Sequence, residues 1–556
     1  MFALLIGLAA AEPAPEIMEA LELELERATK LALQEEPEPW WVQLEIVDGG
    51  YYTAFAELGA LMTDEELPHR VLRVEVRAGD ESFDSANFDS FGEPDGVVQR
   101  GLPVENDTIA LQRELWLATD RAYKQAVEQL ARKEAELEGQ AEERPAIWAA
   151  DPVVDLGGSA RAVQADQIRS RVVAASGVLA EYPQFESGAA AGRDWQGLRA
   201  MVNSEGTRLA QPTGFAVLRV EAILKAEDGS RLRNGRWWVA DSADGLPSIE
   251  VIEAEVRGMA DWLVEVSTAR VVKEYLGPVL FYEPASVELF RQLAATEAIG
   301  TPPAATGRGI FGEVVDKRPA ARVGRRLLPA GWSIVDDPTA DAVGAYRYDM
   351  DGVAAQRVVL VEDGVVRRVL QSRIPASPDG GSTGHGRSLG SERREAQPSI
   401  VQVMPRRSRS LGALQRKGLR MAEQAGAEGL LVVRLLEPPA MSEDFEVFFT
   451  GDAPPAGLTM PYEALILHPD GTEEPVRGLR FSGVDRRALR DIVLSGETGE
   501  YVGVLDGRPG PARYHIGAVG GMPGAWAAPP ILVSEMELVG NHGGDPRRIP
   551  RPPSAE

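Results

Sequence analysis

Apolar residues recur at helical and at alternating spacing through the first half of the chain. Helical spacing predicts helices over residues 16–34, 108–138, 168–182 and 252–266. Alternation predicts antiparallel strands, with hairpin turns at Asp48-Gly49-Gly50 and Asp228-Gly229; these strands cover residues 40–47, 51–61, 71–77, 214–226 and 231–240. This half should therefore combine long helices with antiparallel strands.

Beyond residue 300 the apolar runs become short and are separated by glycine and proline. Asp363-Gly364, Asp470-Gly471 and Asp506-Gly507 adjoin such runs, which is typical of β-hairpins. This part should be mainly antiparallel sheet with few helices. The clearest helix is predicted over residues 485–494, and a closing strand over 531–539.

Residues 277–296 connect the N-terminal half to the part with short apolar runs beyond residue 300. The apolar run 279–282 predicts a buried strand. Pro284 suits the first turn of a following helix, because its missing N–H would be unpaired there in any case. Leu289, Phe290 and Leu293 then share one face of that helix. The predicted unit is a strand, a turn and a helix.

These patterns predict an α+β fold, in which an N-terminal α/β domain with antiparallel strands and long helices precedes a mainly antiparallel, β-rich C-terminal domain. The predicted divisions are an N-terminal α+β domain over 16–190, a central segment over 191–273 and a C-terminal domain over 274–540. The polar, proline-rich residues 541–556 should form a disordered tail.

Residues 1–11 are apolar and end in small residues, which predicts a signal peptide, although the usual leading positive charges are missing. We therefore expect export to the periplasm or the extracellular space, with a cytoplasmic location as the alternative. The rest of the chain has no apolar run long enough to cross a bilayer, so no transmembrane segment is expected.

Charge and cysteine content exclude several classes of function. The formal net charge of -27 disfavours a nucleic-acid partner, because phosphate binding requires a basic surface. The cysteine count is 0, which removes disulfides, thiolate metal sites, iron–sulfur clusters and cysteine nucleophiles together. The histidines are too far apart in sequence for a helical zinc motif; they are His69, His385, His468, His515 and His542.

One serine motif is present, but its context disfavours a serine hydrolase. Residues 380–384 fit G-x-S-x-G, with Ser382 at the centre and His385 next to the motif. A nucleophile elbow requires a strand before the serine and a helix after it. Here Pro375 and Pro378 precede the serine and glycines follow it, which predicts an irregular loop.

Three further motifs are better explained as loops or turns. Residues 307–312 fit G-x-G-x-x-G but follow prolines and enter no clear helix. Residues 349–352 resemble the start of a calcium loop, yet its twelfth position is Leu360 instead of glutamate. The acidic residues around Pro338 predict a solvated turn. A local basic excess could recognise carboxylates or form a solvated loop; it contains Arg387, Arg393, Arg394, Arg406, Arg407 and Arg409.

Several phrases in one order resemble the TldD/PmbA family, metallopeptidase-related proteins once described as modulators of DNA gyrase. They cover roughly residues 40–540, far more than a single motif would. The phrases are Val202-Asn203-Ser204-Glu205-Gly206-Thr207, GPVLFYEPASVELF from Gly277, Asp336-Asp337-Pro338-Thr339 through Tyr348-Asp349-Met350-Asp351-Gly352-Val353, Gln371-Ser372-Arg373, Ser382-Thr383-Gly384-His385-Gly386-Arg387, and Pro529-Pro530-Ile531-Leu532-Val533.

The resemblance implies an HExxxH zinc motif on the helix after the Gly-Pro-Val-Leu-Phe strand, with a downstream cysteine as another ligand. In this chain those positions carry Arg291, Gln292 and Thr296. A guanidinium does not ligate zinc, an amide does not accept a proton as a base, and a threonine hydroxyl is a poor ligand. The motif is degenerate, so we expect no metal and no cofactor at these positions.

The resemblance therefore implies a pseudopeptidase, a non-catalytic subunit that helps bind unfolded peptides. Its partner would be a second copy, forming a homodimer, or a metal-bearing TldD-like paralogue, forming a heterodimer. The alternatives are a hydrolase with a relocated site, using Ser382 with His385 or a pair of carboxylates, and a stand-alone peptide-binding module. The candidate binding residues are Ser382, Thr383, Gly384, His385, Gly386 and Arg387.

Overall fold

The computed structural model describes most of the chain between its two ends. The described residues are 15–33, 36–89, 95–137, 145–302, 304–306, 323–376, 380–388, 393–438, 458–506 and 521–540. The predicted signal peptide, the predicted tail and the glycine motif at 307–312 lie outside these residues. Within them, no helix is both long and apolar enough to span a membrane.

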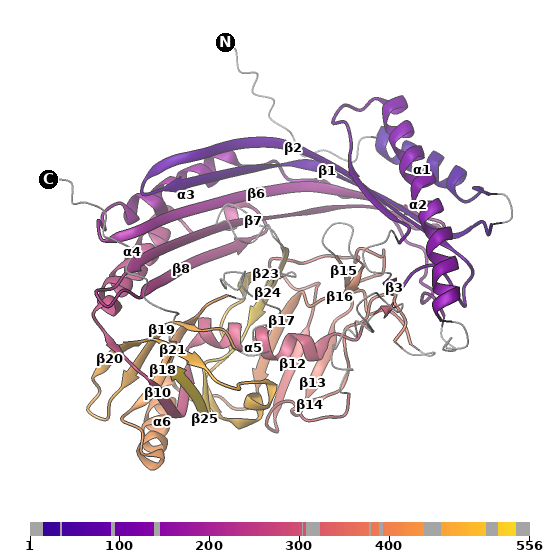
Figure 1. Cartoon of the computed structure of the whole chain (residues 1–556). Helices are drawn as coiled ribbons and strands as arrows, with labels where there is room; N and C mark the ends of the chain where they lie inside the picture. Colours follow the sequence, from indigo (N-terminus) through magenta and orange to yellow (C-terminus); the bar gives the residue numbers. More distant parts are fainter. Residues whose placement is uncertain are drawn as a thin grey trace, which may run out of the picture.

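A long, mainly antiparallel sheet forms the N-terminal half and arches over the C-terminal half (Figure 1). Its strand order is β4-β2-β1-β6-β7-β5, with β8 paired to β7. The strands are β1 (Pro39–Glu57), β2 (Ala60–Ala78), β4 (Val97–Gly101), β5 (Val154–Asp155), β6 (Phe185–Asn203), β7 (Arg208–Lys225) and β8 (Arg231–Ala240).

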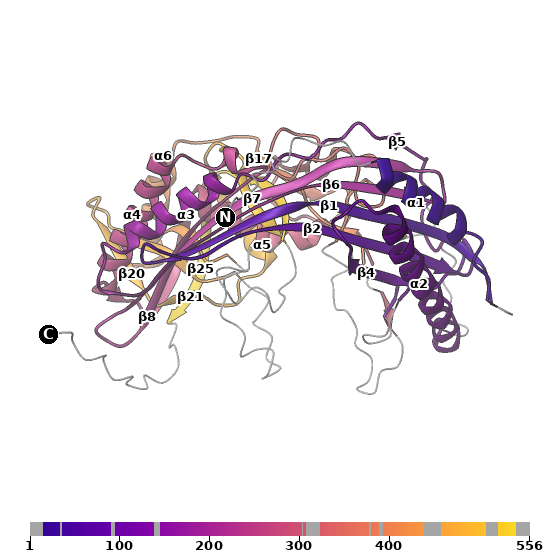
Figure 2. The same cartoon turned by 90° about the horizontal axis from the view of Figure 1, so that it is seen from above.

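Two pairs of helices cover the same face of this sheet, at opposite ends (Figures 1 and 2). Val42, Leu44 and Ile46 of β1 pack against the first pair, and Tyr52 and Ala54 of the same strand pack against the second. Because successive side chains of a strand alternate between faces, these even-numbered residues point to one side. The helices are α1 (Pro15–Ala28), α2 (Thr108–Glu136), α3 (Ala165–Leu179) and α4 (Ile249–Ser267).

The hairpin predicted at Asp48-Gly49-Gly50 is wrong, because β1 continues through these residues and turns only after Glu57. The glycines serve close strand contact instead. Gly49 lies opposite Gly197 of β6, and a Cβ atom on Gly49 would come within 2.1 Å of the Gln196 carbonyl oxygen. The actual turn is at Leu58 and Gly59, both with positive φ.

The boundary predicted after residue 190 lies inside β6, so the segment 191–273 shares the N-terminal sheet instead of forming a separate unit. Its other elements are β7, β8, α4, a short 3-10 helix, η1 (Ala243–Gly245), and β9 (Arg270–Val271), which pairs with a strand of the C-terminal half. The long helices and the Asp228-Gly229 hairpin between β7 and β8 are as predicted.

The C-terminal half contains an eight-stranded and a six-stranded sheet. The first has the order β21-β25-β10-β18-β19-β20-β9 with β22 on β25, and comprises β9 (Arg270–Val271), β10 (Glu274–Phe281), β18 (Leu430–Leu436), β19 (Pro461–Leu467), β20 (Glu473–Arg477), β21 (Leu479–Phe481), β22 (Ile492–Ser495) and β25 (Ile531–Gly540). The second has the order β14-β13-β12-β17-β24-β23, and comprises β12 (Trp332–Asp336), β13 (Val358–Glu362), β14 (Val365–Val366), β17 (Ile400–Pro405), β23 (Val502–Asp506) and β24 (Met522–Ala527).

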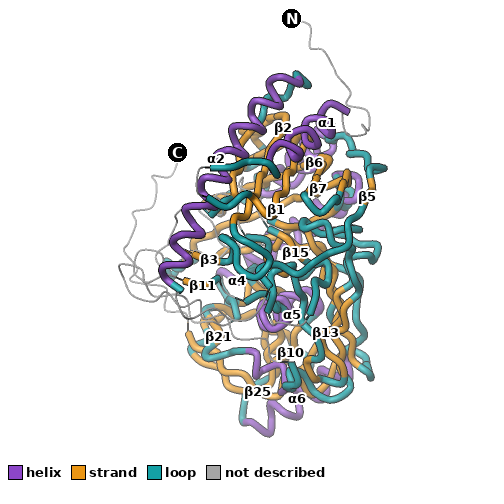
Figure 3. The backbone as a smooth tube through the Cα atoms, turned by 90° about the vertical axis from the view of Figure 1, so that its right-hand side faces the viewer, coloured by secondary structure: helices purple, strands orange, loops and turns teal. Residues whose placement is uncertain are grey.

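Helix α5 (Glu283–Ala298) lies in the middle of this half, among strands and loops (Figure 3). It follows β10 directly and has Pro284 in its first turn, as the sequence predicts. Leu289, Phe290 and Leu293 belong to one apolar core that includes residues of both C-terminal sheets. Two small pairings complete the strands: β3 (Phe88–Asp89) with β11 (Ala305–Thr306), and β15 (Gly386–Arg387) with β16 (Glu395–Ala396).

The α+β class, the mainly antiparallel C-terminal half and the Asp-Gly hairpins at 363–364 and 470–471 are confirmed. The helix predicted over 485–494 is wrong in extent, because only a short 3-10 helix, η3 (Arg486–Asp491), forms before β22. Helix α6 (Leu411–Ala425) was not predicted. It packs through small residues, and a Cβ atom on its Gly418 would come within 2.6 Å of Leu430.

Replacing Gly49 by alanine should destabilise the N-terminal sheet, because the new methyl group would meet the backbone of β6. We expect a loss of about 2 kcal/mol or more in the free energy of unfolding, measured by urea denaturation. Gly101→Ala is the matched control, since a Cβ atom there meets nothing within 4 Å. Equal stability of both variants would contradict close contact between β1 and β6.

Candidate functional site

The odd-numbered side chains of the N-terminal sheet face the C-terminal half and carry an unusual load of charge. Arg73, Glu75 and Arg77 alternate in sign along β2 and are all buried. Arg73 Nη1 donates to Glu75 Oε2 at 2.9 Å, and Arg77 Nη2 donates to Glu75 Oε1 at 2.8 Å. Burial opposes the charge on Glu75, but the two arginines hold the pKa of this carboxyl below its ordinary value.

A turn of the C-terminal half presents a second set of buried acids to this face. The Asp349 carboxylate accepts hydrogen bonds from the backbone N–H groups of Asp351, Val353 and Gly386 at 3.0, 2.9 and 2.8 Å. Burial, followed by the nearby charge of Asp351, raises the pKa of Asp349 to about 7. The predicted turn at 349–352 is thus present, and its carboxylate holds the turn together.

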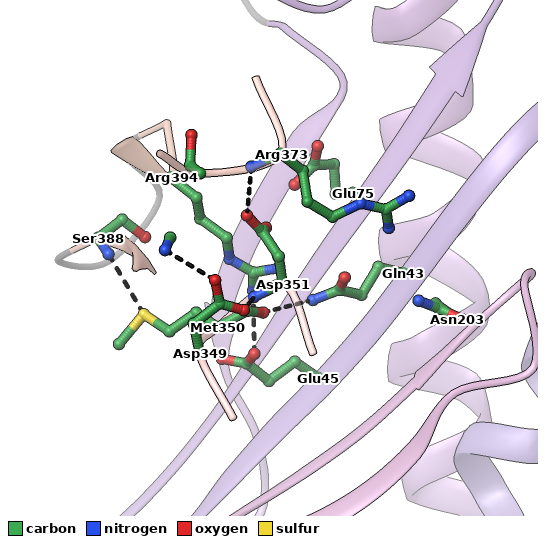
Figure 4. A network of polar contacts seen from close by, with 12 residues as sticks. Gln43, Glu45, Glu75, Asn203, Asp349, Met350, Asp351, Arg373, Ser388 and Arg394 are labelled. Atoms are coloured by element: carbon green, nitrogen blue, oxygen red, sulfur yellow. Dashed lines mark hydrogen bonds and ion pairs between the residues drawn. The ribbon is translucent and has the colours of Figure 1, made fainter. Parts of the chain in front are cut away.

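Hydrogen bonds and ion pairs join these two sets of residues, and we call this contact between the N-terminal sheet and the C-terminal half the interdomain contact (Figure 4). Arg394 Nη2 donates to Glu45 Oε2 of β1 at 2.9 Å, and its Nη1 lies 3.6 Å from Asp351 Oδ1. Gln43 Nε2 donates to the Met350 carbonyl oxygen at 3.1 Å. The two hydrogen bonds link residues 349 and 307 positions apart in the sequence, whereas the ion pair between Arg394 and Asp351 lies within the C-terminal half.

Arg199 of β6 adds contacts to the same turn. Its Nη2 donates to the Asp349 carbonyl oxygen at 2.7 Å and to the Tyr348 carbonyl oxygen at 3.3 Å. The Tyr348 carbonyl also accepts from Gln211 Nε2 of β7 at 2.7 Å. Three neighbouring strands of the N-terminal sheet therefore hold the 348–351 turn from one side.

A bidentate ion pair forms a further link. The Arg373 guanidinium donates to both carboxylate oxygens of Glu205 at 2.6 and 2.7 Å, and its Nε donates to the Trp148 carbonyl oxygen at 2.8 Å. Trp41 Nε1 donates to the same Glu205 carboxylate at 3.1 Å. Arg373 is 1% exposed, so this cation depends on its partner for stability.

The structure separates the roles of the six candidate binding residues. Gly386 and Arg387 form β15 beside the acidic turn, and Arg387 donates to the Pro523 carbonyl oxygen at 2.7 Å. Gly384 adopts a positive φ and sits against the Ala354 backbone. Gly386, Arg387 and His385 are buried, whereas Ser382 and Thr383 are half-buried. The described partners of these residues all lie in the C-terminal half, so the group supports the acidic turn from that side.

Ser382 and His385 do not form a catalytic pair. The Ser382 hydroxyl donates to the Gln371 carbonyl oxygen at 3.2 Å and accepts from the Gly384 N–H at 3.1 Å. His385 Nδ1 lies 2.9 Å from both oxygens of Thr383, and its Nε2 lies 3.5 Å from Asp336 Oδ1. Among the described hydrogen bonds, none joins the serine hydroxyl to the imidazole.

Some arginines of the arginine-rich stretch are buried, and others are exposed on the surface. Arg387 and Arg394 are buried, and Arg393 donates to the Pro302 carbonyl oxygen and to Glu395. Arg406 and Arg407 are exposed, as is Arg409. Arg394 pairs with Glu45 and Asp351, whereas Arg387 donates to the carbonyl oxygens of Pro398 and Pro523, so neither buried charge is presented to a partner.

Arg291 and Gln292 lie on α5, within hydrogen-bond reach of other polar groups. Arg291 Nη2 donates to Glu288 Oε2 at 2.9 Å. Gln292 and Thr459 form a reciprocal pair: Gln292 Nε2 donates to the Thr459 hydroxyl at 2.9 Å, and the Thr459 N–H donates to Gln292 Oε1 at 2.9 Å. Thr296 is on the same helix, one turn further on. Its side chain lies outside the described part of the structure.

Zinc does not fit this part of α5. The polar groups described here are the Arg291 guanidinium, the Gln292 amide and the Thr459 hydroxyl, and the nearby Glu288 is paired with Arg291 across 2.9 Å. Across the described residues, no three His, Cys, Asp or Glu side chains come together as a metal site. The chain also has 0 cysteines to supply a thiolate.

Several residues of the interdomain contact escaped the sequence analysis, among them Glu45, Arg73, Glu75 and Arg199. Each occupies a polar position of an alternating strand, which ordinarily indicates a solvent-facing side chain. The available signal was the alternation of opposite charges along one face of β2, from Arg73 to Arg77. Opposite charges that alternate on one face of a strand indicate that this face is buried and that its charges pair with one another.

Comparison with known proteins gives one domain match. Residues 276–453 match the model of the PmbA/TldA metallopeptidase C-terminal domain. A protein named metalloprotease from Methanothermobacter thermautotrophicus is 28% identical over 187 residues, covering 33% of this chain and 38% of that protein. Another metalloprotease, from Archaeoglobus fulgidus, is 39% identical over 69 residues, covering 12% of this chain and 16% of that protein. The matches thus span well under half the length of these relatives.

Solved structures share the fold over nearly the whole chain. TldE from Thermococcus kodakarensis superposes with a TM-score of 0.57 at 12% identity, covering 94% of this chain and 100% of that chain. A proposed modulator of a DNA gyrase from Thermotoga maritima gives a TM-score of 0.56 at 15% identity, covering 90% and 96%. Both halves of the fold, with the sheet and the C-terminal region together, therefore recur in other proteins.

Replacing Arg373 by methionine should weaken the contact between the two halves, because Glu205 and the Trp148 carbonyl lose their shared donor. We expect a loss of about 3 kcal/mol in the free energy of unfolding, measured by urea denaturation. Arg357→Met is the control, since its ion pair with Asp337 is 3.8 Å long and exposed; about 0.5 kcal/mol or less should be lost. Similar losses in both variants would contradict a structural role for the Arg373 ion pair.

Proposed function

Because the chain belongs to the TldD/PmbA family through its C-terminal domain, we propose that it is a non-catalytic subunit of this metallopeptidase-related family. The observation that carries the proposal is the pairing of polar groups on α5. Arg291 is paired with Glu288, and Gln292 is paired with Thr459. These are the positions at which the family resemblance places a histidine ligand and the general base.

The substitutions on α5 are mutually consistent, which supports a stable replacement of the metal site. Glu288 is 2% exposed and would be costly to bury without a cation, and Arg291 supplies that cation from the next turn of the helix. Gln292 uses its amide N–H as donor and its carbonyl oxygen as acceptor toward Thr459. The side chains at the positions of the zinc ligand and the general base, Arg291 and Gln292, are thus engaged in hydrogen bonds within the protein.

The proposed activity is the binding of unfolded peptides together with a partner subunit. The partner is a second copy of this chain or a metal-bearing paralogue that carries out hydrolysis. We further propose export, on the basis of the apolar residues 1–11. Mass spectrometry of the native N-terminus in separated cell fractions tests export directly, and protein that retains Met1 and is found only in the cytoplasmic fraction would contradict it.

The purified chain should not hydrolyse denatured protein substrates on its own, with or without added zinc. The reason is the absence of a zinc ligand set and a general base on α5. The measurement is release of peptides from a denatured, fluorescently labelled protein, with and without a chelator. Addition of a metal-bearing paralogue to the same assay should produce chelator-sensitive hydrolysis.

Two variants decide the origin of any activity that the pure chain shows. Chelator-sensitive hydrolysis that Gln292→Ala abolishes would contradict the proposal, because it would place a working metal site on α5. Chelator-resistant hydrolysis that Ser382→Ala abolishes would instead support the relocated hydrolase. Thr383→Ser is the matched control for the second variant, because it changes the same loop while retaining a hydroxyl group at each position.

A further inference from the structure

The first half of β2 is an open edge of the N-terminal sheet. β1 pairs with β2 along its whole length, whereas β4 pairs only with Val71–Glu75 on the other side. No other described segment pairs with residues 60–69 on that side. Residues 60–62 and 64–68 are exposed, and Thr63 and His69 are partly buried. An open strand edge of this length is a template for the addition of another strand.

The direction of the backbone groups on this edge follows from the neighbouring hydrogen bonds. The Arg70 carbonyl accepts from the Leu102 N–H at 2.9 Å, and the Val76 N–H donates to the Gly96 carbonyl at 3.0 Å. Even-numbered residues therefore direct their backbone groups away from β1. The register between Thr63 and Arg70 is regular, so Asp64 and Glu66 offer N–H and C=O groups at this edge.

The two faces beside the edge differ in chemistry. On the inner face, Leu67 is 38% exposed and continues a cross-strand row with Tyr51 and Trp195, which are partly buried. On the outer face, Asp64 is held by Arg169 at 3.0 Å, while Glu66 has no partner among the described residues. A strand added here would meet apolar surface on one side and an uncompensated carboxylate on the other.

The charge of the edge disfavours a second copy of β2 paired in the register centred on Glu65. Antiparallel pairing of two copies about a two-fold axis at Glu65 would place Glu66 opposite Asp64 and Glu65 opposite its own copy. Like charges directly opposite each other destabilise a strand pair. The complementary occupant carries positive charge on the face that meets Glu66 and apolar side chains on the face that meets Leu67.

We propose that residues 63–68 of β2 bind an extended peptide by strand addition, with lysine or arginine opposite Glu66 and an apolar residue opposite Leu67. The proposal names a site for the peptide binding put forward above and rests on that function. The backbone of Asp64 and Glu66 supplies affinity for any extended chain. The side chains of Glu66 and Leu67 supply the preference for alternating basic and apolar residues.

The probe is a fluorescein-labelled peptide of eight residues in which lysine and valine alternate. In the proposed register, lysines on the outer face lie opposite Asp64 and Glu66, so their amides hydrogen-bond to β2 while the valine amides point away. Fluorescence anisotropy measures binding. We expect N-methylation of the lysine amides to abolish binding, and N-methylation of the valine amides to leave it within about twofold.

Hydrogen exchange and charge reversal locate the site. The N–H groups of Asp64 and Glu66 should exchange rapidly in the free protein and slowly with the peptide bound. Glu66→Lys should weaken binding by about tenfold, because an attraction becomes a repulsion. Glu255→Lys is the matched control, since it makes the same charge change at an exposed position on α4, and binding should be unchanged.

Three outcomes would overturn the proposal. Binding that survives both lysine N-methylation and Glu66→Lys would place the peptide elsewhere, leaving the proposed peptide-binding function intact. If the N–H groups of Asp64 and Glu66 are protected from exchange without peptide, and the protection rises with protein concentration, a second copy occupies the edge. If the chain binds neither this probe nor any denatured protein, both the proposed site and the peptide-binding function are contradicted.

Discussion

The buried polar contact between the two halves is the constraint on which the rest of the structure depends. Burying the charged groups of either half without their partners would be unfavourable, because an isolated buried charge costs several kcal/mol. Arg394 requires Glu45, and Arg373 requires Glu205. The long sheet and the C-terminal half are therefore fixed relative to each other by chemistry as well as by apolar packing. This explains why the sheet can be long, curved and polar on its inner face.

The phrases that carry the family resemblance converge on this contact. Glu205 lies in the first of them, Asp349 and Asp351 in another, Arg373 in a third and Gly386 in a fourth. Their spacing in the sequence gives no hint that they touch. In the folded chain they form the joint between sheet and turn, which is a structural reason for this set of residues. The α5 helix, by contrast, sits in the apolar core with its own polar pairs.

Local patterns predicted local structure well, and failed where distant parts of the chain decide. The helices of the N-terminal half, the strand before α5 and the Asp-Gly hairpins at 228–229, 363–364 and 470–471 depend on periodicity and turn chemistry, and were predictable. Asp48-Gly49-Gly50 looked like a turn, whereas Gly49 is required by the close approach of β6, about 150 residues away in sequence. Helix α6 was missed because it contains Gly418, and glycine is a poor helix former. Glycine is required there because a Cβ atom would clash with Leu430. The charged inner face was missed because its cover is supplied by the other half of the chain.

The central claim is that α5 holds polar protein contacts in place of a catalytic metal. The most direct test is a crystal structure of the protein grown with zinc, with anomalous diffraction recorded at the zinc absorption edge. The account predicts no anomalous peak beside α5, with Arg291 on Glu288 and Gln292 on Thr459 as described. A strong peak coordinated by residues of α5, with these pairs broken, would contradict it.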